Sequence, residues 1–409
     1  MQITDILRDI GLVLAVGLIS VPIARLLRLP VMIVLVVAGM IAGSSGFGIL
    51  DVPIDSTGPK LLFTLGIAMI LFHGGVGTSL RVISKTAIGL LLLSVPGVMI
   101  TAGIVAVAVV PLFGVSWSIA LLAGAVLAAT DPAILVPLFE RLGLRPKVAQ
   151  TVIAESAIND PVSSILALTL AGIVTAGGLS GFAPIGEFAV SIGVGIICGV
   201  VAGVLIAALL SSHRVGVLRE SPAATLLMLI ALVYVTSEIG GGSPYLAAFI
   251  AGVIVGNKDL LRIDHDHRQE RLLESYISET VNIVVLAIFV VLGLNLDLGI
   301  LRDNLVPGLL VMAVFMLIAR PITVGLCLLP DRRGQWTRQE ITFVAWCRET
   351  GVVPVAVASL LLSEQVPGAE VVVTLVTFAV LSTLLLQATT AGWLAKRLCL
   401  LDGPPPPLK

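Results

Sequence analysis

Long apolar runs alternate with short polar segments along the entire chain. Thirteen of these runs reach or approach the roughly 20 residues that a helix needs to cross a bilayer. Each is expected to be a helix, because an isolated strand would leave its backbone groups without hydrogen-bond partners in lipid. The predicted spans cover residues 10–27, 29–47, 60–78, 86–111, 116–139, 148–176, 184–210, 222–240, 243–257, 275–295, 303–329, 339–362 and 368–395.

The composition agrees with a protein that crosses the membrane many times. Of the 409 residues, 57% are hydrophobic and 12% are charged, whereas soluble domains carry about 25% charged residues. The sequence therefore predicts an all-α polytopic membrane protein, with one transmembrane domain over residues 1–409 and a short cytoplasmic tail at 400–409. The first ten residues, MQITDILRDI, lack the basic region of a signal peptide, so Met1 is expected to begin the mature protein.

Other function classes find little support in the composition. The formal net charge of −1 gives no general attraction to nucleic acid. The sequence contains no H-E-x-x-H motif and no P-loop, so neither a zinc protease nor an ATP-driven pump is indicated. The cysteines have neither zinc-site spacing nor a disulfide framework; they are Cys198, Cys327, Cys347 and Cys399.

The basic residues are distributed very unevenly between the two sides. Nineteen of the 24 Lys and Arg residues fall in the loops after spans 1, 3, 5, 7, 9 and 11 and in the segment after span 13. The opposite side holds only Arg8, Lys60 and Arg302. Because basic loops stay in the cytoplasm, the C-terminus is expected in the cytoplasm and the N-terminus outside the cell (inner) membrane.

An odd number of spans gives spans 1–6 and 8–13 opposite directions, as in the inverted repeats of secondary transporters. Span 5 contains ATDPAILVP and its counterpart, span 12, contains CRETGVVPVA. Both stretches are polar and helix-breaking inside an apolar run. Paired interrupted helices of this kind point to a transport site. We therefore expect broken helices in spans 5 and 12 that cross at the site.

Span 5 carries Asp131 immediately before Pro132. The proline cannot donate to the helix ladder and disfavours helical conformation at Asp131. Carbonyl groups freed near Thr130 can then face a cation, and Asp131 can cap the second half-helix. The alternative is that Asp131 only caps a kink.

Span 6 contains AESAINDPVSS, residues 154–164, with two carboxylates in an apolar run. Glu155 and Asn159 are four residues apart and share a helix face, while Ser156 and Asp160 share the neighbouring face. A hard cation such as Na⁺ prefers oxygen ligands, and the predicted ligands are Thr130, Asp131, Ser156 and Asp160. A carboxylate that binds either H⁺ or a metal ion is the chemical basis of an antiporter.

Glu155 is better suited to a structural ion pair, because an unpaired buried arginine is costly. Its candidate partners are Arg320 and Arg348, the two arginines inside spans. A structural ion pair is also the alternative for Asp160. His73 in span 3 is either a packed, hydrogen-bonded group or a pH modulator.

Two further motifs lead to other interpretations. Gly195, Gly199 and Gly203 form successive G-x-x-x-G steps in span 7, which favour close helix packing, with a dimer face as one candidate. GLSG at residues 178–181 is similar to the nucleophile motif of rhomboid proteases, but no later span supplies a histidine base. A cation-coupled organic solute symporter is the second transport hypothesis. Low aromatic content (5%) and the lack of further polar clusters speak against it.

ATDP in span 5 followed by ESAINDP in span 6 resembles the monovalent cation/proton antiporters of the NhaP and NHE type. The resemblance covers essentially the whole chain. It implies exchange of Na⁺, or K⁺ or Li⁺, for H⁺ in pH homeostasis, without a cofactor. It also implies a homodimer in the lipid bilayer, with a dimerisation part in spans 1–3 and 8–10 and a core in spans 4–6 and 11–13 that moves the ion like an elevator.

The resemblance also implies roles for individual residues. Asp160 would bind cation or proton, and Glu155 would pair with an arginine, Arg320 first. An asparagine before this aspartate, here Asn159, accompanies electroneutral one-for-one exchange. The ion site would be completed by Thr130, Asp131, Ser156 and Asn159.

Two positions depart from the family pattern. His73 stands where many relatives carry an acidic residue, which leaves Na⁺ against K⁺ open. The span 12 sequence Arg348–Glu349–Thr350–Gly351 replaces a direct Arg–Gly pair, so Glu349 adds a charge whose partner the sequence does not identify.

Overall fold

The computed structural model consists of helices joined by short connections, and no strand occurs among the residues it describes. The described cysteines are all free. The structure describes residues 3–27, 29–44, 46–54, 56–78, 80–130, 139, 143–176, 183–209, 222–257, 267–296 and 298–401.

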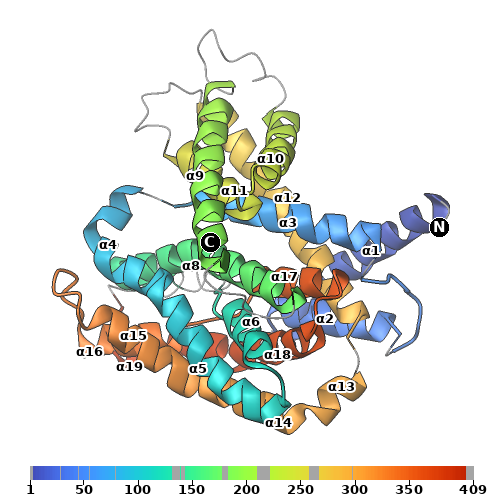
Figure 1. The fold of residues 1–409 in the computed structure, drawn as a ribbon. Coiled ribbons are helices and arrows are strands. Elements are labelled where there is room, and N and C mark those ends of the chain that lie inside the picture. Colours follow the sequence, from blue (N-terminus) through green and yellow to red (C-terminus); the bar gives the residue numbers. More distant parts are fainter. Residues whose placement is uncertain are drawn as a thin grey trace. The chain divides into compact units, whose positions relative to one another are not determined.

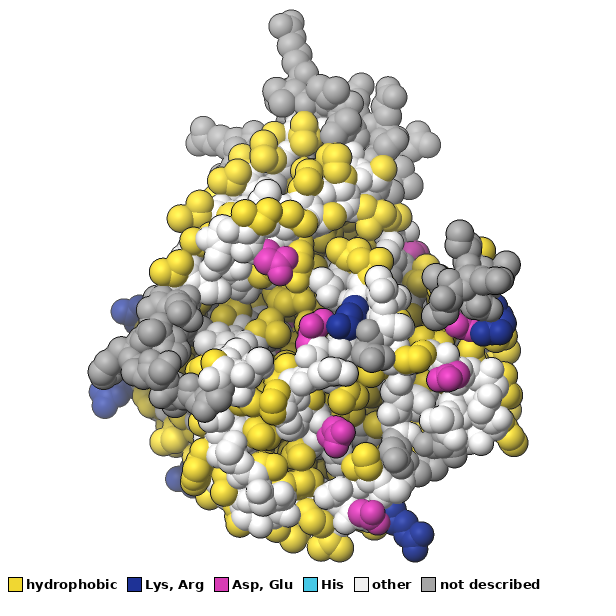
Figure 2. All heavy atoms as spheres, turned by 45° about the vertical axis from the view of Figure 1, so that its right-hand side comes forward, with side chains coloured by type: hydrophobic (Ala, Val, Ile, Leu, Met, Phe, Trp, Pro, Cys, Tyr) yellow, Lys and Arg dark blue, Asp and Glu magenta, His cyan; other side chains and the backbone are white. Residues whose placement is uncertain are grey.

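Over its described residues, every predicted span coincides with a helix or with two or three consecutive helices; residues 131–138 of span 5 lie outside the described part of the chain. Within the described part of the chain, eight helical segments are long and apolar enough to cross a membrane, and five shorter apolar helices occupy the remaining predicted positions. Large apolar side chains are exposed on these helices, including Leu18, Ile197, Val201, Leu232 and Leu309. Figure 2 shows hydrophobic side chains spread over the face in view. Such an apolar exterior suits a lipid environment, while the count of thirteen spans stays a prediction.

The chain divides into two compact units. The larger unit consists of residues 1–60, 83–176 and 286–409. Its helices (Figure 1) are α1 (Ile3–Leu27), α2 (Val31–Ala42), α4 (Leu80–Ser94), α5 (Pro96–Phe113), α6 (Trp117–Leu127), α8 (Pro146–Thr175), α13 (Leu298–Asp303), α14 (Leu305–Val314), η2 (Phe315–Ala319), α15 (Arg320–Leu328), α16 (Arg338–Trp346), α17 (Val352–Ser363), α18 (Ala369–Ser382), η3 (Thr383–Ala388) and α19 (Thr389–Arg397). The elements η2 and η3 are π-helical turns inside longer helices.

The smaller unit consists of residues 61–82 and 177–285. It contains most of α3 (Thr57–Val76), α9 (Ala183–Leu209), α10 (Pro222–Ile239), α11 (Pro244–Gly256) and the first part of α12 (His267–Leu294). Asn257, which ends α11, donates from its amide to the Thr78 carbonyl at 2.7 Å and accepts from the Leu80 N–H at 3.0 Å. This residue therefore fixes the end of α11 to the turn between α3 and α4.

Glycines in the predicted spans mark places where helix backbones touch. A Cβ atom at Gly199 of α9 would lie 2.6 Å from the carbonyl oxygen of Ala247 in α11, and one at Gly203 would lie 2.9 Å from that of Ala251. The G-x-x-x-G face of α9 thus packs on α11 of the same chain. The suggestion of a dimer face for these glycines is wrong, because their open side is already filled within the smaller unit.

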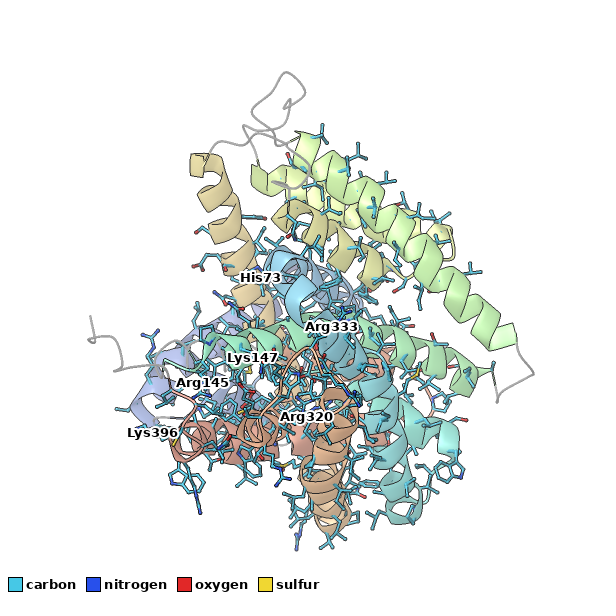
Figure 3. The ribbon with its side chains drawn as sticks, turned by 90° about the vertical axis from the view of Figure 1, so that its left-hand side faces the viewer. His73, Arg145, Lys147, Arg320, Arg333 and Lys396 are labelled. Atoms are coloured by element: carbon cyan, nitrogen blue, oxygen red, sulfur yellow. The ribbon has the colours of Figure 1, made fainter. Side chains whose placement is uncertain are left out.

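Polar contacts join the start of α8 to the connection between α15 and α16 in the larger unit. Lys147 donates to Glu340 Oε2 at 2.8 Å and to the Gln335 carbonyl at 3.1 Å, and its ammonium lies 4.3 Å from the centre of the Trp336 ring. Figure 3 labels Lys147 on α8. Glu340 also closes a capping box with Thr337 at the start of α16.

The end of α19 lies at the same end of the larger unit. The Arg145 N–H donates to the Leu400 carbonyl at 2.9 Å, and Leu144 forms a backbone bridge with Leu401. Three of the segments expected on the basic side therefore lie together, as the alternation of basic loops requires.

Replacement of Gly199 by alanine is expected to lower the melting temperature in detergent, because the new methyl group must displace the α11 backbone. Overpacking of this kind costs about 1–3 kcal/mol. The matched control is Gly193→Ala on the same helix, where nothing lies within 4 Å of an added Cβ. Alanine has the higher helix propensity, so the control should melt at the wild-type temperature or above. Equal losses for both variants would contradict the assigned packing face.

Candidate ion-binding site

The helix α8 brings three of the predicted site residues to the end of α6. Ser156, Asn159 and Asp160 occupy adjoining positions over about one turn, and all three are buried, as is Thr130 just beyond α6. The helix continues through Pro161, which has no N–H to donate to the preceding turn. The site is therefore built between a continuous helix and the place where another helix stops.

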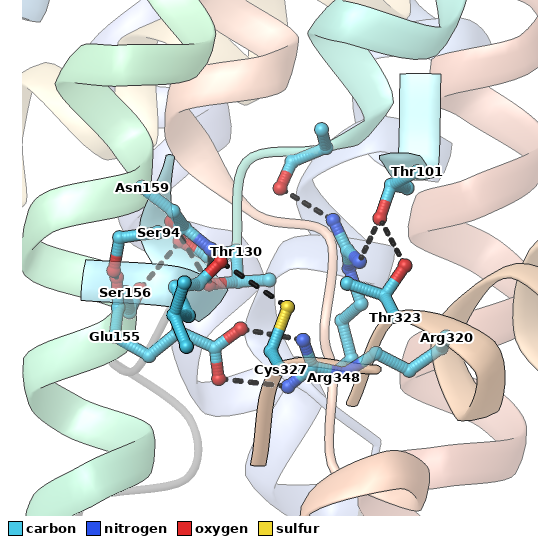
Figure 4. A network of polar contacts seen from close by, with 12 residues as sticks. Ser94, Thr101, Thr130, Glu155, Ser156, Asn159, Arg320, Thr323, Cys327 and Arg348 are labelled. Carbon is cyan, nitrogen blue, oxygen red and sulfur yellow. Dashed lines mark hydrogen bonds and ion pairs between the residues drawn. The ribbon is translucent and has the colours of Figure 1, made fainter. Parts of the chain in front are cut away.

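All three side chains of α8 contact Thr130, and Figure 4 labels Ser156 and Asn159 beside it. The Thr130 N–H donates to Asp160 Oδ1 at 3.0 Å, and Ser156 Oγ donates to the Thr130 carbonyl at 2.6 Å. Asn159 Nδ2 donates to Thr130 Oγ1 at 2.9 Å. Backbone groups that lost their helical partners are thus satisfied by side chains, and carboxylate, amide and hydroxyl oxygens gather around one residue.

The sequence grouped Asn159 with Glu155 on one helix face, but the structure separates the two. Asn159 turns toward Thr130, while Glu155 turns toward α15. Asp131, the second predicted carboxylate of the site, lies outside the described residues, and so does Ser180 of the GLSG motif.

Glu155 and Arg320 form a bidentate ion pair. Arg320 Nη1 lies 2.5 Å from Glu155 Oε1, and Nη2 lies 2.8 Å from Oε2. Both side chains are only 2% exposed. Arg320 follows the π-helical turn η2 directly, and such turns often occur at functional sites because they re-aim the residues next to them. The pair links α8 to α15, and its partner is the arginine named first from the sequence.

Arg348, the other candidate partner, contacts the end of α6 instead. Its Nη2 atom donates to the carbonyls of Ala128 and Leu127, and its Nη1 atom donates to Thr101 Oγ1 at 3.4 Å. The guanidinium also lies 4.9 Å from the centre of the Phe315 ring. A helix C-terminus carries a partial negative charge and unpaired carbonyls, so the end of α6 can accept hydrogen bonds from the guanidinium.

The end of α6 and the predicted interruption of span 12 therefore meet, while residues 131–138 of span 5 lie outside the described residues. The chain leaves helical conformation between Trp346 and Val352, where Arg348 projects to the end of α6 beside Thr130. The cation of one break balances the negative helix end of the other.

Several contributing residues did not stand out in the sequence. Thr101 and Thr323 form a hydrogen bond of 3.1 Å with each other, and Thr101 also accepts from Arg348. Ser163 donates to the Ala125 carbonyl at 2.6 Å. The available signal was a hydroxyl residue in an apolar run. That signal is weak, because hydroxyl groups also bond to their own helix, as Thr169 does.

His73 lies on α3, in the smaller unit, and is half-buried. Figure 3 labels it. The residues around Thr130 all belong to the larger unit. The role of His73 as a pH modulator stays a prediction.

The class of protein follows from this fold and from comparison with known proteins. The family described as "Sodium/hydrogen exchanger, transmembrane" matches residues 11–397. The chain therefore belongs to the sodium/hydrogen exchanger family. It is an integral membrane transporter and not an enzyme, which removes the rhomboid interpretation.

Particular relatives carry the same assignment. The K⁺/H⁺ antiporter NhaP2 of Shewanella oneidensis is 31% identical over 97% of this chain and 67% of its own length. The low-affinity Na⁺/H⁺ antiporter NhaS1 of Synechocystis is 28% identical over 94% of this chain and 72% of its own. The predicted kinship with NhaP-type antiporters is thus confirmed.

A solved structure has the same fold. The sodium proton antiporter MjNhaP1 from Methanocaldococcus jannaschii superposes with a TM-score of 0.82, at 24% identity, over 96% of this chain and 99% of that one. The all-α polytopic fold expected from the sequence is confirmed.

Glu155→Gln is expected to destabilise the protein strongly, because it leaves the Arg320 guanidinium buried without its counter-charge. Breaking a buried pair costs about 3–5 kcal/mol. In a double-mutant cycle of melting temperatures, Glu155→Gln should couple strongly to Arg320→Met and only weakly to Arg348→Met. The matched reference is Asp160→Asn, which should melt well above Glu155→Gln. Equal coupling to both arginines would contradict the assignment of Arg320 as the partner of Glu155.

Proposed function

We propose that the protein exchanges a monovalent cation, Na⁺ or K⁺, for H⁺ across the membrane, with Asp160 binding either the cation or the proton. The observation that carries this proposal is the convergence of Asp160, Asn159 and Ser156 on Thr130 at a helix break. A buried carboxylate surrounded by neutral oxygens suits a hard monovalent cation. When no cation is bound, burial favours the protonated form.

Competition for one carboxylate couples the two fluxes. The Thr130 N–H holds one oxygen of Asp160 in a fixed direction, so the arriving cation meets an oriented ligand. Because the cation and the proton use the same group, release of one is required for binding of the other. Asn159 has no titrating proton, and one proton therefore moves for each cation in the proposed mechanism.

The larger-scale mechanism rests on family resemblance. We propose alternating access by an elevator movement of spans 4–6 and 11–13 within a homodimer, whose contacts involve spans 1–3 and 8–10. The distribution of basic residues supports a cytoplasmic C-terminus and an external N-terminus in the inner membrane. Asp131 and His73 complete the proposal as a further cation ligand and a pH modulator.

The choice between Na⁺ and K⁺ is left to experiment, because relatives of both kinds occur. One is named a K⁺/H⁺ antiporter and another a Na⁺/H⁺ antiporter. Membership of the exchanger family favours antiport over the symport of an organic solute.

Asp160→Asn is expected to abolish exchange while leaving the protein folded, since asparagine cannot carry a proton. The measurement uses proteoliposomes with an internal pH dye and external additions of Na⁺, K⁺ and Li⁺ in turn. Wild-type protein should acidify or alkalinise the lumen according to the direction of the cation gradient. Thr169→Val, which removes a hydroxyl bonded only to its own helix, is the control and should retain exchange. Wild-type flux in Asp160→Asn would contradict the proposal that Asp160 binds the cation and the proton.

Exchange should also be electroneutral, and acid should weaken cation binding. Where Asp160 is mostly protonated, the apparent cation affinity should fall about tenfold per pH unit, because one proton is displaced per cation. Sodium jumps should produce a pH-dye signal in proteoliposomes and no transient transport current when the same proteoliposomes are adsorbed to a solid-supported membrane. This arrangement avoids K⁺ as a voltage clamp, which would interfere if K⁺ is transported. A transport current would require a second charge to move with each cycle.

A further inference from the structure

A buried threonine outside the ion site holds the guanidinium of Arg348. Arg348 Nη1 donates to Thr101 Oγ1 of α5 at 3.4 Å (Figure 4). The other amino group, Nη2, donates to the carbonyls of Leu127 and Ala128 at the end of α6. Among the described residues, Thr101 supplies the side-chain acceptor of this guanidinium, and the Nε atom has no hydrogen-bond partner there. The direction in which Arg348 meets α6 therefore depends on one hydroxyl group.

Thr101 is in turn held in place by α15. Its Oγ1 atom forms a hydrogen bond of 3.1 Å with Thr323 Oγ1, and both residues are 1% exposed. Gly97, one turn earlier on α5, lets the two helices approach closely, because a Cβ atom there would lie 3.1 Å from Thr323 Cγ2. A hydroxyl confined between two packed helices has little freedom to reorient, so Thr101 is a fixed acceptor for Arg348.

The same part of α5 also packs against α6. A Cβ atom at Gly124, in the last turn of α6, would clash with the carbonyl oxygen of Ala102, the residue that follows Thr101. Ala128, whose carbonyl accepts from Arg348, lies one turn beyond Gly124. Helix α5 therefore supports the end of α6 twice, through this close backbone contact and through the guanidinium that Thr101 holds.

These contacts belong to a path of polar interactions that starts and ends on α8. The path leaves α8 at Glu155 and returns to it at Asp160, and its intermediate members are Arg320, Thr323, Thr101, Arg348 and Thr130. All of them lie in the larger unit. The Thr130 N–H, which fixes the direction of one Asp160 oxygen, follows two residues after the carbonyl of Ala128 that Arg348 binds. Thr101 is an uncharged link in this path, so its hydroxyl can be removed without changing the number of buried charges.

We propose that Thr101 is a positioning residue for cation binding: its hydroxyl holds Arg348, and Arg348 holds the end of α6 that presents Thr130 to Asp160. This inference rests on the proposed exchange of a monovalent cation for H⁺ at Asp160. Residues that orient the ligands of a metal ion from outside the site change its affinity by about 10–100-fold when they are replaced. Loss of the Thr101 hydroxyl therefore weakens cation binding, although Thr101 contributes no atom to the proposed ion site.

The test measures the half-saturating cation concentration for dye-reported exchange in proteoliposomes, with Na⁺ or K⁺, whichever the wild-type protein exchanges. Thr101→Val keeps the shape of the side chain and removes its hydroxyl. The half-saturating concentration should rise about tenfold, while the maximal rate changes less. Thr101→Ser keeps the hydroxyl and should remain near the wild-type value. Thr323→Val, which removes the partner of that hydroxyl, should give a smaller rise. A merely structural role would lower the melting temperature and leave the half-saturating concentration unchanged.

Thr377→Val is the matched control, because Thr377 is also 1% exposed but its hydroxyl donates to the Val373 carbonyl of its own helix at 2.8 Å. It should leave the half-saturating concentration unchanged. The proposal is overturned if Thr101→Val keeps the wild-type value, if Thr101→Ser rises as far as Thr101→Val, or if Thr377→Val rises equally. If Thr101→Val does not fold or shows no flux, Thr323→Val decides by the same comparison.

Wild-type protein and Asp160→Asn, measured beside these variants, distinguish failure of this inference from failure of the proposed function. Exchange that is absent from the wild type, or that persists in Asp160→Asn, overturns the proposed function and this inference with it. An unchanged half-saturating concentration in Thr101→Val, beside an active wild type and an inactive Asp160→Asn, overturns this inference alone.

Discussion

Backbone groups at a helix break inside an apolar span must find partners within the protein, and the site around Thr130 is built by that requirement. At the end of α6, Arg348 donates to the Ala128 carbonyl and Ser156 donates to the Thr130 carbonyl. Ser163 adds a hydrogen bond to the Ala125 carbonyl, which also accepts from the Ala128 N–H. The Thr130 N–H finds Asp160. In lipid an unsatisfied group of this kind costs several kcal/mol. The same interactions that make the break tolerable therefore gather the oxygens that can bind an ion.

The Glu155–Arg320 pair serves a different purpose from the neighbouring Asp160. A buried bidentate pair has well-defined geometry, but the desolvation of both charges offsets most of its attraction, so it adds little net stability compared with apolar residues. Removal of one member nevertheless destabilises the fold strongly, because the other charge stays buried without its partner. Such a pair fixes α8 against α15 in one register. In the proposed mechanism, Asp160, just over one turn further along α8, exchanges its ligand while this pair holds the helix in place. Two carboxylates on one helix thus have separate tasks because their partners differ: a guanidinium for one, a backbone N–H for the other.

Much of this architecture could be predicted from the sequence, and the part that could not has a common cause. Apolar runs gave the spans, and the polar, proline-containing stretches gave the breaks, because each signal is local. Contacts between spans are not local. From the residues alone, Arg320 and Arg348 were both candidates for Glu155, and the family resemblance put Arg320 first. The fold shows that Arg348 instead binds a helix terminus, a partner that carries no formal charge. The glycines of α9 predicted close helix packing, but only the structure shows that the facing helix is α11.

In the proposed mechanism, the donor set around Thr130 allows a proton and a cation to replace one another. Three of its four residues are neutral at any physiological pH, so the charge of the site is set by what Asp160 binds. A proton or a monovalent cation leaves that charge at zero, whereas a divalent cation would leave an uncompensated positive charge in an apolar span. The neutral oxygens of Thr130, Ser156 and Asn159 then decide between ions by distance and direction rather than by charge. In this proposal, discrimination between Na⁺ and K⁺ depends on how rigidly the break holds these oxygens. Arg348, which donates to the carbonyls of Leu127 and Ala128, would contribute to that rigidity without contacting the ion.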